Sequence, residues 1–375
     1  MLICTINAAQ IDKHSLFIIN NKNNNNKQRK NMNNFKKIGL TALAASLVST
    51  SVFAGEMAVT GKAAINFENY SADKTAGSKA AGTKAFSMGN QLTFKGSGEL
   101  DNGLNVALSF VLDQNDDKAT DDQATVGKYN AGSPFDSHSV SISSDAMGTL
   151  KFHGEGGDSA QNAAGDTAAG NIWDNFDTRN GKSSKLKESR AGDNIMHYTL
   201  PSMVEDLTVA VSYTPAGGKS SSDSAYALTY AGVEGLSVSY AKGSNDGRKA
   251  QVEGKAAVAG AADASTIKAS YVYGSFTLAY SDHEYDSSVA TEDQDAKSFK
   301  VSYTITDALS VTYAEDEIDS GTAGDQDAKY SKVSASYTAG GMTVSANMQE
   351  MEHGDYSTAA SADEEYVGLS VSFAF

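Results

Sequence analysis

The carboxy-terminal stretch Tyr366-Val-Gly-Leu-Ser-Val-Ser-Phe-Ala-Phe375 alternates between apolar residues and small or polar ones. Successive side chains of an extended strand point to opposite faces of a sheet, so one face carries Val367, Leu369, Val371, Phe373 and Phe375. The other face carries Tyr366, Gly368, Ser370, Ser372 and Ala374. Nearly every apolar segment upstream repeats the pattern, with serine, threonine, lysine or alanine on the second face. A sheet with one apolar side, one wet side and no free edge predicts a β-barrel in lipid.

The amino-terminal segment, residues 1–54, is expected to be an export signal and not part of the fold. Two lysines precede a short apolar core, Ile38 to Val48, and small residues follow as far as Ala54. Because roughly 20 apolar residues are needed to span a bilayer, this core predicts a Sec-type signal peptide cleaved after Ala54. Residues 1–31 are interpreted as a mis-called start extension, since such polar, low-complexity sequence builds no core. Residues 55–375 are then a single barrel domain.

Net charge argues against a nucleic-acid-binding protein, and cysteine content argues against a fold held by disulfides. The chain has a formal net charge of −16, and removing the basic leader, with its net +6, leaves −22. Nucleic acid is therefore not an expected partner, because phosphate contacts need clustered lysine and arginine. The one cysteine, Cys4, lies in the leader, so no disulfide framework holds the exported part.

Short turn motifs join the expected strands in pairs, and long polar connections alternate with them. Asp101-Asn102-Gly103 has the chemistry of a tight hairpin, and other strand pairs meet at 145–148, 201–206, 232–235, 273–275, 306–308 and 339–341. The count is about sixteen strands, an even number, as bacterial single-chain barrels require. The sequence therefore predicts an all-β, antiparallel transmembrane barrel with short turns on the periplasmic side and long loops outside.

Aromatic residues mark both ends of these strands. Strands that run toward long loops end in Phe67, Phe110, Phe152, Tyr213, Tyr240, Tyr280 and Tyr313. Strands that run toward short turns end in Tyr230, Tyr271, Tyr303, Tyr337 and Phe375. Amphipathic rings prefer the headgroup level of a bilayer, so two aromatic bands are expected.

The exported part as a whole, from its first strand EMAVTGKAAINFENY to the terminal VGLSVSFAF, resembles the Gram-negative general porins, particularly their alphaproteobacterial branch. The resemblance implies a trimeric, sixteen-stranded outer-membrane barrel whose third long loop folds inward, and which passes small hydrophilic solutes passively. It also implies that Phe375 belongs to the signal read by the outer-membrane barrel assembly machinery. Outer-membrane lipid and lipopolysaccharide are the implied surroundings.

The longest stretch without a strand pattern, from about His153 to Gly192, matches the position of that inward-folded loop. We expect Trp173 and Phe176 to anchor it on the inner wall. The residues expected at the constriction are the acids Glu155, Asp158, Asp166, Asp174 and Asp177, the base Arg179, and the facing wall lysines Lys62, Lys95 and Lys151. Opposed charges across a narrow, wet gap set up a transverse field that screens solutes. The alternative is that these are ordinary solvated loop charges.

Acidic residues also gather in the other expected loops, among them Glu315 to Glu317, Glu350 and Glu352. A negative vestibule concentrates cations, so modest cation selectivity is expected. The wall shows neither an aromatic ladder for sugars nor a basic ladder for phosphate, which favours an unspecialised sieve. No cofactor or metal site is expected, since the acidic run that starts at Asp113 lacks the glycine and final glutamate of a calcium loop.

Two other functions stay open from the sequence. A surface adhesin or receptor barrel would use its loops and not its lumen. A barrel-type hydrolase would need a histidine beside an acid, and the candidates are His283 and His353, which lie near Asp282 and Asp355 in expected outer loops. No established catalytic motif is present, so we expect no enzyme activity.

Overall fold

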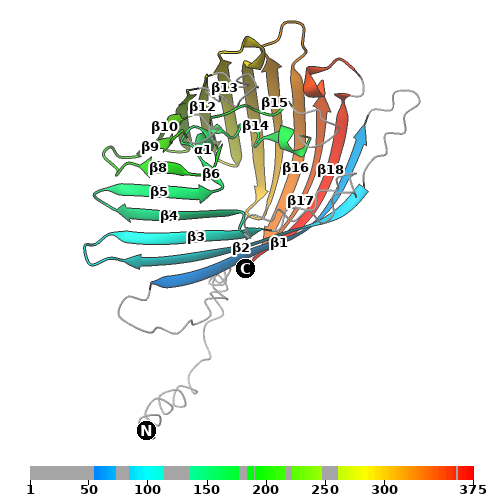
Figure 1. Cartoon of the computed structure of the whole chain (residues 1–375). Helices are drawn as coiled ribbons and strands as arrows, with labels where there is room; N and C mark the ends of the chain where they lie inside the picture. Colours follow the sequence, from blue (N-terminus) through cyan, green and yellow to red (C-terminus); the bar gives the residue numbers. More distant parts are fainter. Residues whose placement is uncertain are drawn as a thin grey trace, which may run out of the picture. The chain divides into compact units, whose positions relative to one another are not determined.

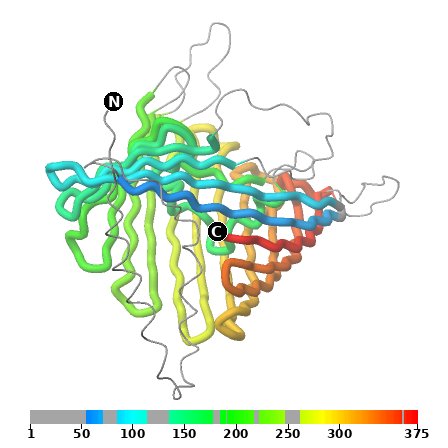
Figure 2. The backbone as a smooth tube through the Cα atoms, turned by 90° about the horizontal axis from the view of Figure 1, so that it is seen from below, coloured from blue at the N-terminus to red at the C-terminus, as the bar shows by residue number. Residues whose placement is uncertain are grey.

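The computed structural model describes residues 55–72, 84–113, 135–176, 184–189, 191–216, 222–246, 261–359 and 362–375. Sixteen antiparallel strands in these ranges form a closed barrel (Figure 1 and Figure 2). The expected fold class and strand number are confirmed. The expected leader, residues 1–54, lies outside the described residues, so its cleavage after Ala54 stays a prediction.

The barrel strands are β1 (Glu56–Ala72), β2 (Lys84–Glu99), β3 (Asn105–Asp113), β4 (Ser137–Ser144), β5 (Gly148–Glu155), β8 (Ile195–Thr199), β9 (Leu207–Thr214), β10 (Asp223–Val233), β11 (Leu236–Asn245), β12 (Ala262–Tyr273), β13 (Phe276–Ser287), β14 (Gln294–Thr306), β15 (Leu309–Ser320), β16 (Ala328–Ala339), β17 (Met342–Glu352) and β18 (Glu364–Ala374). The connection from β5 to β8 contains β6 (Gly157–Asp158), α1 (Asn162–Gly165), the 3-10 helix η3 (Ile172–Asn175) and β7 (Ala191–Gly192). Two outer connections contain η4 (Ala290–Glu292) and η5 (Gly354–Tyr356). Across the described ranges, no helix has the length and apolar character needed to cross a membrane.

The barrel closes where the last strand pairs with the first. Ile65 of β1 lies opposite Val371 of β18, and Phe67 opposite Leu369. The carboxy-terminal residue completes this seam, because the Gly61 amide donates to the Phe375 carbonyl oxygen at 2.6 Å. In Figure 2 the red end of the chain accordingly runs beside the blue first strand. Closure gives every strand two neighbours, so no unpaired edge is exposed to lipid.

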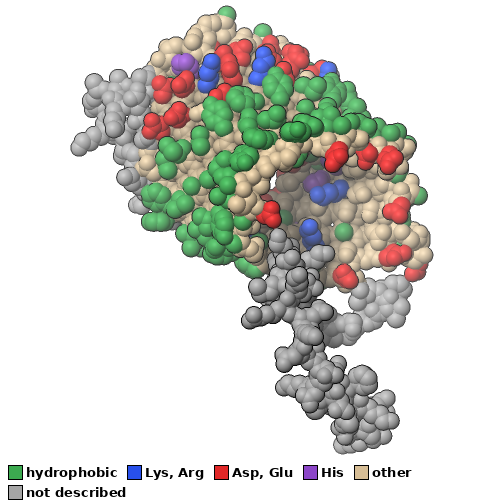
Figure 3. Space-filling model, turned by 180° about the vertical axis from the view of Figure 1, so that it is seen from behind, with side chains coloured by type: hydrophobic (Ala, Val, Ile, Leu, Met, Phe, Trp, Pro, Cys, Tyr) green, Lys and Arg blue, Asp and Glu red, His purple; other side chains and the backbone are tan. Residues whose placement is uncertain are grey.

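The two faces of the wall differ as the alternation predicts. On β18, Leu369 and Phe373 are 46% and 41% exposed on the outer surface, whereas Tyr366 is 6% exposed and points inward. Figure 3 shows hydrophobic side chains spread over the outer wall, with basic and histidine side chains visible through the opening into the interior. Apolar exposure on this scale is typical of a surface that faces hydrocarbon.

Short turns lie where the sequence placed them. The aromatic residues expected to end the strands that run toward long loops lie inside those strands instead, because β11 and β13 continue for five and seven residues beyond Tyr240 and Tyr280. Gly103 has a φ of +79° in the turn between β2 and β3, a conformation that favours glycine. The amide of Leu104 donates to Asn102 Oδ1 at 3.2 Å and fixes that turn. On the outer face, neighbouring aromatic rings contact one another, as in the Tyr226–Tyr240, Phe299–Tyr313 and Phe276–Tyr303 pairs.

Several strands are longer than the sequence indicated. The sequence between Phe67 and Leu92 is mostly polar, yet its described part is strand, because β1 and β2 pair as far as Asn69 opposite Lys84. Polar composition hid the alternation of Phe86 and Met88, both of them outward and exposed.

Strands longer than expected also change the interpretation of the acidic residues assigned to outer loops. Glu315 and Glu317 lie on β15, where they alternate with the buried Asp316 and Ile318 and therefore face outward. Glu317 forms a 3.7 Å ion pair with Lys329 on that outer surface. Glu350 and Glu352 likewise belong to β17 and not to a loop. Strand pairing continues beyond the apolar band, so charged residues at a strand end do not by themselves indicate a loop.

Candidate functional site: the inner loop and the pore wall

The connection between β5 and β8, residues 156–194, folds into the barrel and is called the inner loop below; its residues 177–183 and 190 lie outside the described ranges. Its two arms are joined at the base by the pairing of β6 with β7. Above that base, Gln161 Oε1 accepts from the Ser189 amide at 2.7 Å, and Asn162 Nδ2 donates to Glu188 Oε2 at 3.0 Å. The inner loop is therefore a braced hairpin and not a loose strap.

Backbone amides of the inner loop are satisfied by polar side chains of the barrel wall. These hydrogen bonds run from Ala160 to Ser212 Oγ, Ala168 to Ser281 Oγ, Ala169 to Ser298 Oγ, Ile172 to Asp316 Oδ2 and Lys187 to Gln294 Oε1, at 2.7 to 2.9 Å. Buried amides need partners, and the small polar residues on the inward face of the strands supply them. The polar, inward-facing side of the barrel wall therefore serves in part to bind the inner loop.

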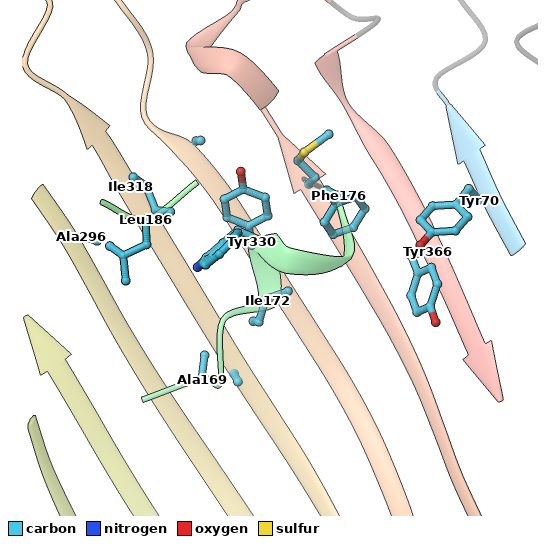
Figure 4. Close-up of a cluster of buried hydrophobic side chains, with 13 residues drawn as sticks. Tyr70, Ala169, Ile172, Phe176, Leu186, Ala296, Ile318, Tyr330 and Tyr366 are labelled. Carbon is cyan, nitrogen blue, oxygen red and sulfur yellow. The ribbon is translucent and has the colours of Figure 1, made fainter. Parts of the chain in front are cut away.

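An apolar cluster holds the tip of the loop. Trp173 and Phe176 are 6% and 1% exposed, and the Phe176 ring centroid lies 5.9 Å from that of Tyr330 on β16. Figure 4 shows Ile172, Phe176 and Leu186 of the loop lying over the strands that carry Ile318 and Tyr330. Sequence reasoning singled out the two aromatic loop residues but missed their wall partners, Ile318, Tyr330 and Met351. A signal for these three residues was present in the sequence. They are apolar, although the strand alternation places them on the inward face of the wall, where most residues are small or polar.

The acids expected at the constriction occupy different places. Asp158, Asp166 and Asp174 are exposed on the inner loop, whereas Glu155 ends β5 and lies 3.6 Å from His138. Asp166 Oδ1 accepts from Asn171 Nδ2 at 2.8 Å, which fixes the turn after α1. Asp177 and Arg179 lie outside the described residues, so their expected roles stay predictions.

A fourth acid, Glu188, joins Asp158 and Asp166 from the returning arm and was missed in the sequence. Burial, followed by the nearby charges of Asp166 and Asp158, raises the Glu188 pKa to about 7. Burial and the charge of Asp166 raise the Asp158 pKa as well. Like charges held close together in a partly desolvated site favour the neutral carboxylic acid. No sequence pattern indicated this role, because Glu188 stands among basic residues.

The wall lysines divide into two groups. Lys62 and Lys95 are exposed on β1 and β2, and Lys151 on β5 lies close enough for its charge to influence Asp158. Among the described residues, no ion pair joins any of these three to the acids of the inner loop. All three lie on the inward face of the barrel wall.

A second set of lysines corrects the expectation that the wall has no basic row. Lys268, Lys300 and Lys332 occupy inward positions on the alternate strands β12, β14 and β16, at a constant spacing of 32 residues. Lys268 Nζ donates to the Asp166 carbonyl oxygen at 2.8 Å, so this row lies next to the inner loop. Its regular spacing is visible in the sequence once alternate strands are aligned.

The histidines proposed for a hydrolase do not assemble a site with their neighbouring acids. His283 is not in an outer loop but on β13, where it is 3% exposed and bonded to Thr266 Oγ1 at 3.0 Å. Asp282, on the opposite face of the same strand, accepts from the Tyr280 hydroxyl. His353 Nδ1 lies 3.3 Å from the carbonyl oxygen of Asp327. In the described part of the chain, no three metal-ligating side chains come together either.

Comparison with known proteins agrees with this geometry. Residues 39–343 match a family model described as Gram-negative porin. No curated protein sequence matches the chain.

Solved structures similar to this chain are porins and a related outer-membrane protein. A porin refined at 1.8 Å resolution is 18% identical, with a TM-score of 0.58, over 85% of this chain and 100% of its own. An anion-selective porin from Comamonas acidovorans is 16% identical, with a TM-score of 0.58, over 86% of this chain and 100% of its own. The outer-membrane protein OmpT of Vibrio cholerae, lacking loop L8, is 14% identical, with a TM-score of 0.59, over the same two shares. At these identities the likeness shows the fold alone.

Proposed function

The chain belongs to the Gram-negative porin family and is an outer-membrane channel protein, and on that premise we propose that small hydrophilic solutes and ions cross it by passive diffusion. The observation that carries the proposal is the inner loop, which is braced across the polar wall by hydrogen bonds from its backbone. A loop held in this way narrows a water-filled lumen without filling it, as selective passage requires. Family and fold are those of channels and not of enzymes, so the hydrolase alternative is set aside.

The proposed selectivity is a mild preference for cations. Four carboxylates of the inner loop support it: Asp158, Asp166, Asp174 and Glu188. The lysines on the inward face of the wall oppose a preference for cations. Because an anion-selective porin shares the fold, the fold does not decide which ions are preferred, and the local placement of charge does. The acids lie on the loop that narrows the lumen. Because the electric field is strongest in this narrow part, we expect the acids to affect ion selectivity more than the wall lysines do, and cations to be preferred.

Assembly and export complete the proposal. We propose a homotrimer in outer-membrane lipid and lipopolysaccharide, exported through the Sec pathway with cleavage after Ala54. The barrel assembly machinery is proposed to recognise the carboxy-terminal strand with Phe375, whose main chain pairs with Gly61 at the seam of the closed barrel. Trp173 and Phe176 serve as the anchors of the inner loop.

The decisive experiment is reconstitution of the purified protein in planar bilayers. Steady single-channel currents, with a reversal potential in a potassium chloride gradient that indicates cation preference, are the expected result. A receptor barrel with a plugged lumen would pass no steady current, and this outcome would overturn the channel proposal.

A further inference from the structure

One glutamine of the wall binds the backbone of the returning arm of the inner loop, residues 184–189. Gln294, the first residue of β14, is 4% exposed. Its Oε1 accepts from the Lys187 amide at 2.7 Å, and its Nε2 donates to the Lys185 carbonyl oxygen at 3.0 Å. Leu186, between these two residues, is buried in the apolar cluster of Figure 4. The side-chain amide therefore pairs with the arm as a neighbouring strand would, through one donor and one acceptor.

The outer turn η5 holds both Gln294 and the arm. Gln294 Nε2 also donates to the Tyr356 hydroxyl at 2.7 Å. In the same turn, the Asp355 amide donates to Ser184 Oγ at 3.0 Å. His353, Asp355 and Tyr356 have φ values of 56°, 54° and 56°, in the left-handed region that residues with a Cβ rarely adopt. Such a backbone persists only where surrounding contacts hold it, so the contacts to Gln294 and the arm are part of what keeps η5 in place.

The arm also carries a positive charge that is bound at the outer rim of the barrel. Lys187 Nζ donates to the carbonyl oxygen of Glu292 in η4 at 2.6 Å. It lies 5.7 Å from the ring centroid of Tyr285, which is near the outer end of β13. A carbonyl dipole and an aromatic face both attract an ammonium group. The charge of Lys187 is therefore held against the rim and is not free in the lumen.

We propose that Gln294 is a positioning residue for charge selectivity, an inference that rests on the proposed channel function. Its amide holds the arm so that the Lys187 ammonium group stays bound at the rim, and the carboxylates of the inner loop then act on passing ions unopposed by it. Without this amide the arm loses two backbone hydrogen bonds, and the flexible lysine side chain reaches the water of the lumen. A positive charge there repels cations and attracts anions.

The test compares zero-current potentials in planar bilayers that contain the full-length exported protein, under a potassium chloride gradient. Gln294→Ala should lower the ratio of potassium to chloride permeability by about twofold, because it releases a positive charge into the lumen. In a Lys187→Gln background, the same substitution of Gln294 should leave the ratio unaltered. A merely structural role for Gln294 would give the same shift whether or not Lys187 is present. Should Gln294→Ala fail to insert, Tyr356→Phe provides the comparison with a smaller change.

Gln326→Ala is the matched control, since this exposed glutamine lies near the same turn and donates to the adjacent Asp325 carbonyl oxygen at 3.4 Å. Its permeability ratio should equal that of wild type. No shift in Gln294→Ala, or an equal shift in the Lys187→Gln background, would overturn the inference while leaving the channel intact. A wild-type protein that passes no steady current would instead refute the channel function on which the inference depends.

Discussion

The backbone amide of Ile172, at the tip of the inner loop, donates a 2.8 Å hydrogen bond to Oδ2 of Asp316, 144 residues further along the chain. Asp316 is 1% exposed and stands on the inward face of β15, between the outward Glu315 and Glu317. Residues remote in sequence thereby fix the position of the loop that narrows the lumen. A carboxylate that receives a buried backbone amide forms one of the stronger hydrogen bonds available to a protein.

Replacing Asp316 with alanine should loosen the loop tip while the barrel stays folded. Loss of the acceptor leaves the Ile172 amide buried and unpaired, at a local cost of about 1–3 kcal/mol. Amide hydrogen exchange at Ile172 should accelerate, and open-channel current noise should rise. Glu317→Ala, on the outer surface of the same strand, is the control and should change neither. Unaltered exchange at Ile172 in Asp316→Ala would contradict the assigned role.

Glu188 should make the channel sensitive to pH near neutrality. Its pKa is about 7 in the folded protein, against an ordinary value of 4.5, chiefly because of burial and the charge of Asp166. The lumen therefore gains a negative charge as pH rises through 7, and cation preference should rise with it. Reversal potentials measured across this pH range should shift in wild type and stay flat in Glu188→Gln. Glu205→Gln, on the exposed turn between β8 and β9, should retain the wild-type shift.

The raised pKa of Glu188 also predicts how the stability of the folded protein changes with pH. Between pH 4.5 and 7 the folded state holds a proton on Glu188 that the unfolded chain has released. Stability contributed by this group therefore falls as pH rises through that window and is level above it. Urea titrations of wild type and Glu188→Gln should converge at the acid end of the window and diverge above it. Parallel curves throughout would show that Glu188 ionises normally.

Neutralising Asp174 and Asp177 together, by substitution with asparagine, tests the acids of the constriction. Removing two negative charges from the narrowed part of the lumen should lower both the cation preference and the conductance at low salt. The effect should diminish at high salt, where charges are screened. Single-channel currents at two salt concentrations provide the measurement. Unchanged selectivity and conductance would remove both residues from the constriction.

A pair of adjacent residues tests which face meets hydrocarbon. Val301 lies on the outer face of β14 between Phe299 and Tyr303, and Lys300 points into the lumen. Arginine on the lipid face costs about 2–4 kcal/mol at the bilayer midplane, so Val301→Arg should weaken folding into vesicles by an amount in that range. Lys300→Arg should be close to neutral in the same urea titration. Equal costs at the two positions would mean that the faces have been assigned wrongly.

Much of the fold could be predicted from the sequence because strand alternation is a local property. Residues such as Leu369 and Phe373 reveal the lipid-facing side of β18 wherever its partner strands lie. The alternation fails as a guide at strand ends, where Phe86 and Glu317 lie among polar residues that read as loop. It also fails where the lumen is apolar, as at Ile318, since that position serves the inner loop and not water.

The sequence by itself determined a closed barrel, its strand pairs, its two faces and the position of the long connection after the fifth strand, because period-two patterning and turn chemistry are written in neighbouring residues. Only the tertiary structure decided that Asp316 holds Ile172 and that Glu188 joins two other loop acids. Those relationships depend on barrel closure and on the path of the inner loop across the wall. They bring together residues between 22 and 144 positions apart, and no local pattern encodes which of them will meet.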